Sequence, residues 1–382
     1  MKPTRRPWIV LLLCVLAPGR ARAEGPWRIS QDTLVYGDDD NVLVVSPQLA
    51  VRRRIEGGEV QVREVVDAVS AASVDLVSAA SRRFTEVRSE LDIDALRSFG
   101  RWVPSLGYAF SKERDYTSHA FSAALETQLG SPDTTLQLGW ALSLDRIGRA
   151  QTSRAVFERD LASHGAEITL TQVLGPRTVA RAVYTLTVQD GYLEKPYRYV
   201  PLFEQATVDM LAARGETLGL HNFSRWSDAV RPPEEVPDLR VGHAVAVRLL
   251  RWLGRLGAAR LDYQLYLDDW GIVAHTVEPT LSTRLGEQLT VSLFGRLYAQ
   301  AAASFWRRTY VVTRGVLPRY RTLDRELSTY QNLTGGARVE WQRGDALSLY
   351  GEASAMRTSY DDYLLLSRRL ALIGQVGVRW TP

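Results

Sequence analysis

Four of the five histidines in this chain begin the same phrase, a histidine, nine further residues and then Leu-Gly. The four are His119, His164, His243 and His275. Histidine is the commonest protein ligand of transition metals, so a repeated histidine could serve a metal ion. A single ion needs its ligands at about 2.1 Å. Whether the four histidines can meet that requirement depends on the elements that carry them.

Those elements are predicted strands, because apolar residues recur at every second position between each histidine and its leucine. After His243 they are Val245, Val247 and Leu249. A period of two is typical of a strand with one apolar and one polar face. Ten residues that rise ~3.3 Å each, tilted by roughly 40°, cover about 25 Å, the height of the apolar band of an outer-membrane barrel. The repeat therefore predicts bilayer-spanning strands, with histidine at the outer rim and Leu-Gly at the periplasmic rim.

On alternate strands of such a barrel, neighbouring histidines lie about 9–10 Å apart, because strands are spaced by ~4.8 Å. By parity they also point outward, where side chains diverge. We therefore expect no metal site, and we interpret the four histidines as interfacial residues at the level of the lipid headgroups. Contact with a lipopolysaccharide phosphate is one alternative. A β-bulge that turned a histidine inward would restore metal binding.

Sixteen segments show the alternation of a membrane strand. They are residues 28–37, 42–55, 59–70, 84–96, 102–112, 118–129, 134–145, 164–174, 178–190, 240–253, 257–268, 273–285, 289–300, 331–342, 346–357 and 369–380. Short turns alternate with longer segments, as in barrels with short periplasmic turns and long outer loops. The longer segments are 71–83, 146–163, 191–239, 301–330 and 358–368. We predict an all-β protein, an antiparallel up-and-down transmembrane β-barrel of about 16 strands.

The polar parity of these strands is rich in charges of both signs. Charged side chains are costly against lipid and tolerated in a wet lumen, so we expect them to line the interior. The candidates are Glu86, Arg88, Glu90, Asp92, Asp94, Arg181, Arg248, Arg260, Asp262, Arg296, Arg338 and Glu340. Sixteen strands leave room for an aqueous channel. The mixed charges could line that channel, or pair across it and close it together with the loop 191–239.

Acidic residues gather at the predicted outer strand ends. Hard cations such as calcium favour clustered carboxylates. The candidates for such a contact are Asp38, Asp39, Asp40, Asp268 and Asp269. The first three lack the alternate-residue spacing of a calcium loop. Solvated loop ends are the preferred interpretation, and cation bridging to lipopolysaccharide is the alternative.

No catalytic constellation stands out. Asp145 with His164, or Asp268 with His275, could meet at a strand end as in outer-membrane hydrolases. Parity places the aspartate inside and the histidine outside, which prevents the hydrogen bond that a general base requires. The only cysteine is Cys14, so the mature chain offers no thiolate. We expect no enzyme activity, no cofactor and no metal, and the net charge of +4 gives no indication of nucleic-acid binding.

The ends of the chain carry targeting signals. Residues 1–23 have the charged start, the apolar stretch and the small-residue cleavage site at Ala23 that are typical of a secretory signal peptide. No later apolar run is long enough to span a membrane as a helix. The last strand ends at Trp380, the kind of aromatic terminus that the barrel-assembly machinery reads. We predict one barrel domain over residues 24–382 in the cell outer membrane, with outer-membrane lipid, lipopolysaccharide and the assembly machinery as partners.

Eight short motifs are spread along the chain. They cover residues 36–40, 69–81, 83–86, 115–119, 170–178, 190–192, 196–198 and 268–271. Together they resemble the domain of unknown function 3570 family of bacterial proteins, over nearly all of the mature chain except 200–239. The resemblance implies a bacterial outer-membrane barrel of undefined activity, and it supplies no catalytic residues.

The strand count and the polar lumen favour one function, a porin-like channel or facilitator for small solutes. The alternative is a non-conducting, plugged barrel whose outer loops bind a partner or a surface glycan. An outer-membrane hydrolase is the second alternative.

Overall fold

The computed structural model describes residues 27–71, 84–228, 231–312 and 315–382, without the side chains at positions 71, 84 and 85. The predicted signal peptide and most of the predicted loop 71–83 lie outside these residues. No helix within the described ranges is long and apolar enough to cross a membrane.

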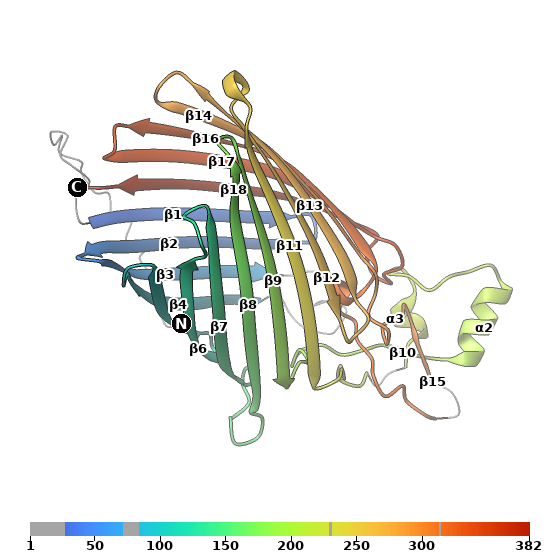
Figure 1. Cartoon of the computed structure of the whole chain (residues 1–382). Helices are drawn as coiled ribbons and strands as arrows, with labels where there is room; N and C mark the ends of the chain where they lie inside the picture. Colours follow the sequence, from blue (N-terminus) through green and yellow to red (C-terminus); the bar gives the residue numbers. More distant parts are fainter. Residues whose placement is uncertain (1–26, 72–83, 229–230, 313–314) are drawn as a thin grey trace, which may run out of the picture.

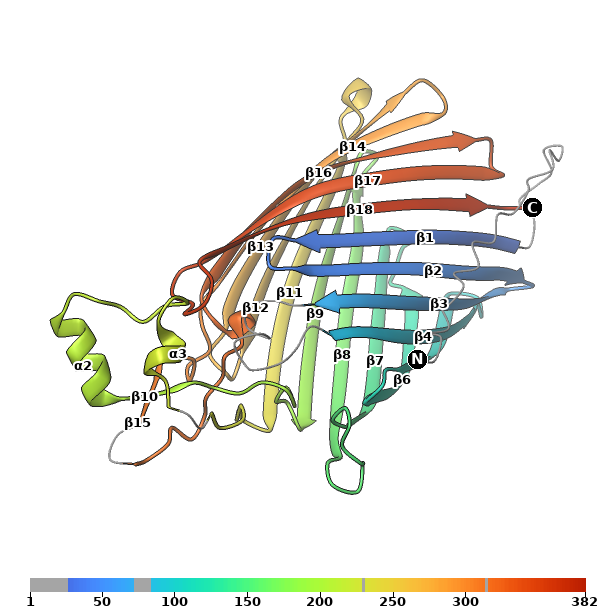
Figure 2. The same cartoon turned by 180° about the vertical axis from the view of Figure 1, so that it is seen from behind.

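Sixteen strands in the described part of the chain close into one antiparallel barrel (Figures 1 and 2). They are β1 (Trp27–Asp38), β2 (Val42–Ile55), β3 (Gly58–Ala71), β4 (Phe84–Arg97), β5 (Trp102–Lys112), β6 (Tyr116–Gln128), β7 (Thr134–Ile147), β8 (Arg159–Gly175), β9 (Thr178–Gly191), β11 (Leu239–Trp252), β12 (Ala258–Asp268), β13 (Val273–Leu285), β14 (Leu289–Gln300), β16 (Tyr330–Arg343), β17 (Leu347–Tyr360) and β18 (Arg368–Trp380). Barrel neighbours are also neighbours in this order, and β1 pairs with β18 to close the ring. Closure leaves no strand edge unpaired. The predicted all-β, up-and-down barrel is confirmed.

Two strands depart from their sequence pattern. The outward positions of β1 include Gln31 and Thr33, which weaken its alternation, yet β1 is paired along both edges. The largest boundary error concerns β8, which begins at Arg159 instead of near His164. Its first residues continue the hydrogen-bonded ladder to Ile147 of β7. They stand beyond the apolar band, so the alternation ends before the ladder does.

The two faces of the barrel differ in polarity. Large apolar side chains of one parity are exposed on the outside, for example Leu106, Leu372 and Val376, which are 67%, 71% and 63% exposed. The opposite parity carries charged and hydroxyl side chains that bond to one another inside. An apolar exterior around a polar lumen is the distribution that a bilayer requires.

The two ends of the barrel also differ, and we name them by their connections. At the turn end the strands are joined by short turns, such as the two residues between β2 and β3. At the loop end lie the long connections after β9 and β14. The sequence predicts that the turn end is periplasmic and the loop end is outside the cell.

The longest loops fold into an assembly of their own at the loop end, beyond the ends of the strands (Figures 1 and 2). It contains β10 (Leu202–Glu204), α2 (Gln205–Ala213), α3 (Phe223–Trp226), β15 (Tyr310–Val312) and the 3-10 helix η2 (Arg325–Leu327). β10 and β15 pair in parallel, which joins the loop after β9 to the loop after β14. The sequence pattern predicted only connecting segments here, because each element is too short to show a period.

Most of the buried apolar core of the described residues lies in this loop assembly. The core joins the connections after β9, β12, β14 and β17, represented by Phe203, Trp270, Leu327 and Leu364. Phe203 is fully buried. A polar lumen offers no apolar core, so burial concentrates where the loops meet and fixes them relative to one another.

Candidate functional site

The inner wall of the barrel carries ion pairs, beginning on β3 and β4. Arg63 lies directly opposite Asp92, and its Nε is 2.7 Å from the carboxylate. Arg88 pairs with Glu90, two residues along the same strand. The charges predicted for this part of the lumen are therefore neutralised by close neighbours.

The same arrangement recurs on the strands from β11 to β14. Asp262 on β12 pairs with Arg248 on β11 and with Arg260 on its own strand. Arg296 on β14 lies 2.7 Å from Glu278 on β13. Each guanidinium again finds its carboxylate on the same strand or on an adjacent strand.

Arg338 on β16 completes the series. It lies 3.4 Å from Glu340 and 3.7 Å from Glu352 on β17, and its guanidinium stacks on the ring of Tyr350 at 3.7 Å. All of these pairs run along the wall, whereas a pair that closed the lumen would join distant strands. The wall charges named here therefore pair with their neighbours in the wall and do not bridge the lumen.

Two other predicted lumen residues have different surroundings. Asp94 faces Gly107, where an added Cβ would lie 2.6 Å from the aspartate oxygen, so glycine makes room for this carboxylate. Arg181 on β9 lies directly opposite Arg248, and its buried Nε has no hydrogen bond.

Glu86, the last predicted lumen residue, belongs to an acidic group at the loop end. Carboxylate oxygens of Glu86, Glu113 and Asp115 lie within 4.8 Å of one another. Burial raises the pKa of Glu113; Arg88 opposes this rise, and Asp115 adds to it. The group went unnoticed in the sequence because two members lie in a three-residue connection and the third on another strand. An acidic group alone does not define a metal site.

The four repeated histidines lie on β6, β8, β11 and β13, which are alternate strands of the barrel. Each histidine is displaced by two residues from the previous one across the strand between them. The facing residues are Leu144 and Leu142 on β7, Val188 and Leu186 on β9, and Leu267 and Leu265 on β12. One residue of stagger per strand corresponds to a strand tilt of roughly 35°. At that tilt all four histidines lie at one height.

Each of these histidines contacts an aromatic side chain on the preceding strand of the barrel. The pairs are Tyr108–His119, Tyr184–His243 and Tyr263–His275, with 2.9 Å between the tyrosine oxygen and Nδ1, and Trp140–His164, with ring centroids 6.3 Å apart. The rings are thus separate from one another and belong to an aromatic belt on the outside of the barrel. This geometry fits the interfacial interpretation.

The five candidate aspartates Asp38, Asp39, Asp40, Asp268 and Asp269 form hydrogen bonds or ion pairs with other residues of the chain. Backbone amides donate to four of them: Asp40 and Val42 to Asp38, Leu370 to Asp39, Ile272 to Asp268, and Val241 to Asp269. Asp268 also lies 2.7 Å from Arg240, and Asp40 lies 2.5 Å from Arg325. The side chains of Asp38 and Asp268 are fully buried and that of Asp40 is buried, so the interpretation of these three as solvated loop ends is wrong. In short turns, aspartate side chains commonly accept hydrogen bonds from backbone amides. The alternation of polar and apolar residues in the sequence does not reveal these bonds.

Partly buried ion pairs join the two longest loops to each other. Arg198, in the loop after β9, lies 2.6 Å from Asp324 in the loop after β14 and 3.3 Å from Glu234 in its own loop. Glu234 also accepts hydrogen bonds from the hydroxyl of Thr322 and the amide of Lys195. The two loops therefore share one polar network beside the apolar core.

The same two loops reach short turns elsewhere on the rim. Tyr197, next to Arg198, donates to Asp115 in the turn between β5 and β6. Arg325, next to Asp324, pairs with Asp40 in the turn between β1 and β2. We call this chain of contacts the loop strap; it comprises Asp115, Tyr197, Arg198, Asp324, Arg325 and Asp40. The sequence gives no signal for it, because partners such as Asp40 and Arg325 are 285 positions apart.

The loop strap is expected to loosen in acid. Burial alone would raise the pKa of Asp324, but Arg198 and the amide of Glu326 hold that pKa below its usual value. A carboxyl with a depressed folded pKa stabilises the fold above its unfolded pKa, about 3.9, and this stabilisation is lost as the pH falls through the folded pKa. Hydrogen-exchange protection around Asp324 should therefore be equal at pH 7 and pH 5 and fall at about pH 3. Protection that persists at about pH 3 would contradict this, and Asp324→Asn is the control that should remove the change.

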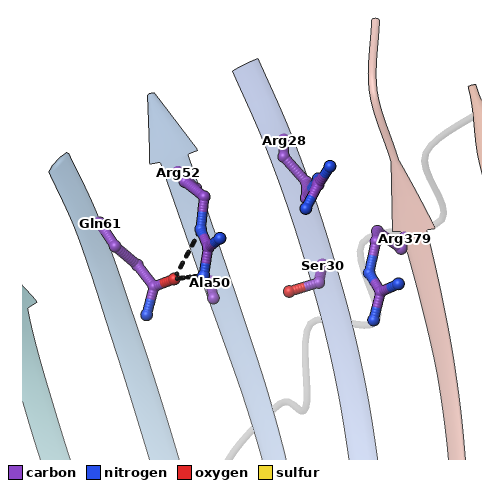
Figure 3. A pocket seen from close by; sticks show the side chains of 6 residues that line it. All are labelled: Arg28, Ser30, Ala50, Arg52, Gln61 and Arg379. Carbon is purple, nitrogen blue, oxygen red and sulfur yellow. Dashed lines mark hydrogen bonds between the residues drawn. The ribbon is translucent and has the colours of Figure 1, made fainter. Parts of the chain in front are cut away.

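At the turn end the inner wall contains a cavity. It has a volume of about 330 Å³ and is lined by Arg28, Ser30, Ala50, Arg52, Gln61 and Arg379 (Figure 3). A second cavity of about 250 Å³ shares Arg52 and Gln61 with the first. Arg28 was missed because the first strand alternates weakly. Arg52 was missed because it stands in a run of three arginines, so inward and outward positions cannot be told apart by their polarity.

Comparison with known proteins supports the fold and leaves the activity open. A solved structure titled "Bacterial polysaccharide outer membrane secretin" is 7% identical with a TM-score of 0.52, over 94% of this chain and 100% of that chain. CdiB from Acinetobacter baumannii is 8% identical with a TM-score of 0.52, over 93% of this chain and 61% of that chain, so this chain spans less than two thirds of CdiB. Such low identity shows the fold alone. No curated protein matches the chain. A family model described as "Protein of unknown function (DUF3570)" matches residues 78–360.

Proposed function

The chain belongs to the DUF3570 family of proteins of unknown function, and from that premise we propose that it is an outer-membrane channel for small polar solutes. Membership confirms the resemblance expected from the sequence motifs and brings no activity with it. The proposal therefore rests on the lumen.

The observation that carries the proposal is the direction of the wall ion pairs. Arg63–Asp92, Arg296–Glu278 and the pairs of Arg338 join neighbouring positions of the wall, and none of them bridges the lumen. A ring of sixteen strands is wide enough for an aqueous passage when its side chains do not meet in the middle. The two cavities at the turn end support such a passage.

The exterior supports an outer-membrane location. Outward positions carry large exposed apolar residues, and the histidine–aromatic pairs form a belt at one height. Amphipathic aromatic rings are enriched where the apolar band meets the headgroups. On this proposal the loop assembly stands at the outer mouth and limits the size of solutes that enter.

Proteoliposome swelling tests the proposed function. Vesicles containing the refolded, mature protein should swell faster in small solutes, such as glycine or arabinose, than vesicles without protein. The rate should fall with solute size, because the loop assembly narrows the entrance. Heat-unfolded protein is the control. Folded barrel that produces no swelling in any of these solutes would overturn the proposal.

One observation favours a second candidate, a non-conducting barrel whose loops bind a partner. The loop assembly has its own apolar core around Phe203 and the buried network around Glu234. Loops that only limit access do not need such order, whereas a binding surface benefits from preorganisation. Folded protein that fails to swell vesicles but retains the protected loop core would favour this candidate.

A further inference from the structure

Three arginines lie side by side on the inner wall at the turn end, where they line the 330 Å³ cavity (Figure 3). We call Arg28 on β1, Arg52 on β2 and Arg379 on β18 the turn-end arginines. Arg28 lies directly opposite Arg52, and Arg379 lies opposite Ser30, two residues further along β1. Three adjacent strands thus present three guanidinium groups at about the same level.

The turn-end arginines have less counter-charge than the wall arginines that form ion pairs, such as Arg63, Arg296 and Arg338. Arg52 donates to the side-chain oxygen of Gln61 at 3.0 and 2.8 Å and lies 3.1 Å from Glu59. Among the described residues, Arg28 and Arg379 have neither an ion pair nor a side-chain hydrogen bond. One carboxylate therefore faces three guanidinium groups.

An inward carboxylate further along β1 is already engaged. Asp32, two residues beyond Ser30 on β1, accepts hydrogen bonds from Tyr350 and from Gln48. An added Cβ at Gly377, opposite Asp32, would lie 2.1 Å from its carboxylate, so the wall is tightly packed around this group. Asp32 is held in place and is not available to neutralise Arg28 or Arg379.

This arrangement costs stability unless an anion compensates it. Like charges directly opposite each other on neighbouring strands are destabilising. Elsewhere the wall mostly places carboxylates beside its arginines, as Asp92 lies beside Arg63; Arg181, opposite Arg248, is an exception. At the cavity two wall arginines on adjacent strands, Arg28 and Arg379, have no ion pair among the described residues and share a lining that is otherwise polar and mostly uncharged.

We propose that the turn-end arginines form a binding site for a small oxyanion, a carboxylate or phosphate group, on the path through the lumen. The position of this site on a path through the lumen rests on the proposed channel function. The site then names the class of solute that the channel would carry, small oxyanions. Planar guanidinium forks bind carboxylate and phosphate in a bidentate manner. The Ser30 hydroxyl and the Gln61 amide add uncharged hydrogen-bonding groups. Arginines that line a pore favour anions over cations.

The test uses the full mature protein with Arg28 and Arg379 both replaced by glutamine. Arg52 is kept because it is bonded within the wall. Arg53→Gln is the matched control: Arg53 lies on β2 beside Arg52 but faces outward, with its guanidinium 4.8 Å from the ring of Trp27. The control removes a charge at the same level from the opposite face of the same strand.

Two measurements separate this inference from the channel proposal. In planar bilayers under a potassium chloride gradient, the wild type should prefer chloride, the double variant should lose about threefold or more of that preference, and Arg53→Gln should keep it. In detergent, inorganic phosphate should raise the thermal midpoint of the wild type by roughly 2 °C or more over chloride at equal ionic strength, because ligand binding stabilises the folded state. The double variant should lose this rise.

The outcomes are distinct. Open channels without anion preference, or with a preference that the double variant retains, would overturn the oxyanion site and leave the channel standing. Absence of current together with a phosphate effect that the double variant abolishes would overturn the channel and support the site. Absence of both would overturn both.

Discussion

Replacing Phe203 with alanine is expected to release the loop assembly while the barrel stays folded. Phe203 is fully buried at the centre of the apolar core that joins four loops. Truncation of a buried phenylalanine costs about 3–5 kcal/mol, because transfer free energy is lost and a cavity remains. Most of this core lies in the loops, and the strands contribute few buried members, such as Ala274 on β13 and Tyr360 on β17, so the loss should fall mainly on the loops. Trypsin should then cut the loop after β9, which contains Arg214 and Arg225, much faster than in the wild type.

The control for Phe203→Ala is Val156→Ala in the loop after β7, where the side chain is 76% exposed. Its truncation should leave the cleavage rate unchanged, since little apolar area is lost. Urea unfolding of the strands should have the same midpoint in all three proteins. A Phe203→Ala protein as resistant to trypsin as the wild type would contradict the assigned core. A lowered strand midpoint would show that the loops and the barrel unfold together.

Arg325→Gln is expected to have an effect of similar size on the loop strap. Asp40 and Arg325 are both buried, at 3% and 8% exposure, and are 2.5 Å apart. Removing one partner of a buried ion pair costs about 3–5 kcal/mol, because the remaining charge stays in a medium of low dielectric. Glutamine keeps much of the side-chain length but not the charge. Hydrogen-exchange protection of the turn between β1 and β2 and of η2 should both fall.

The double variant Asp40→Asn with Arg325→Gln separates charge from packing. If the loss comes from the charge of Asp40 staying buried without the guanidinium of Arg325, removing both charges should restore most of the protection, and the two substitutions should be strongly non-additive. Equal losses in the single and double variants would mean that the guanidinium acts by shape alone. Unchanged protection in the single variant would contradict the loop strap.

Most of the barrel could be predicted from the sequence because a period of two is a local property. The residues of the His-x9-Leu-Gly phrase alternate within one strand, so they reveal strand type and length without any knowledge of the partners. Even the common height of His119, His164, His243 and His275 follows, since strands of equal length end at the same levels. The early start of β8 escaped because its first residues are not constrained by an apolar surface.

The loop assembly and the turn-end arginines could not be predicted in the same way. Arg198 meets Asp324, and Asp40 meets Arg325, only after the barrel has closed, so no sequence period links them. Parity assigned most of the wall charges to the lumen but could not tell pairs along the wall from pairs across it. That distinction depends on register, as in the direct opposition of Arg63 and Asp92.

The measurement that tests the central claim most directly is single-channel recording of the refolded, mature protein in planar bilayers. The wall pairs join positions on the same or adjacent strands and none of them bridges the lumen, so on the proposed channel function we expect reproducible current steps of uniform size. Protein with a folded, protease-resistant barrel that inserts into the bilayer and gives no current steps would contradict an open lumen.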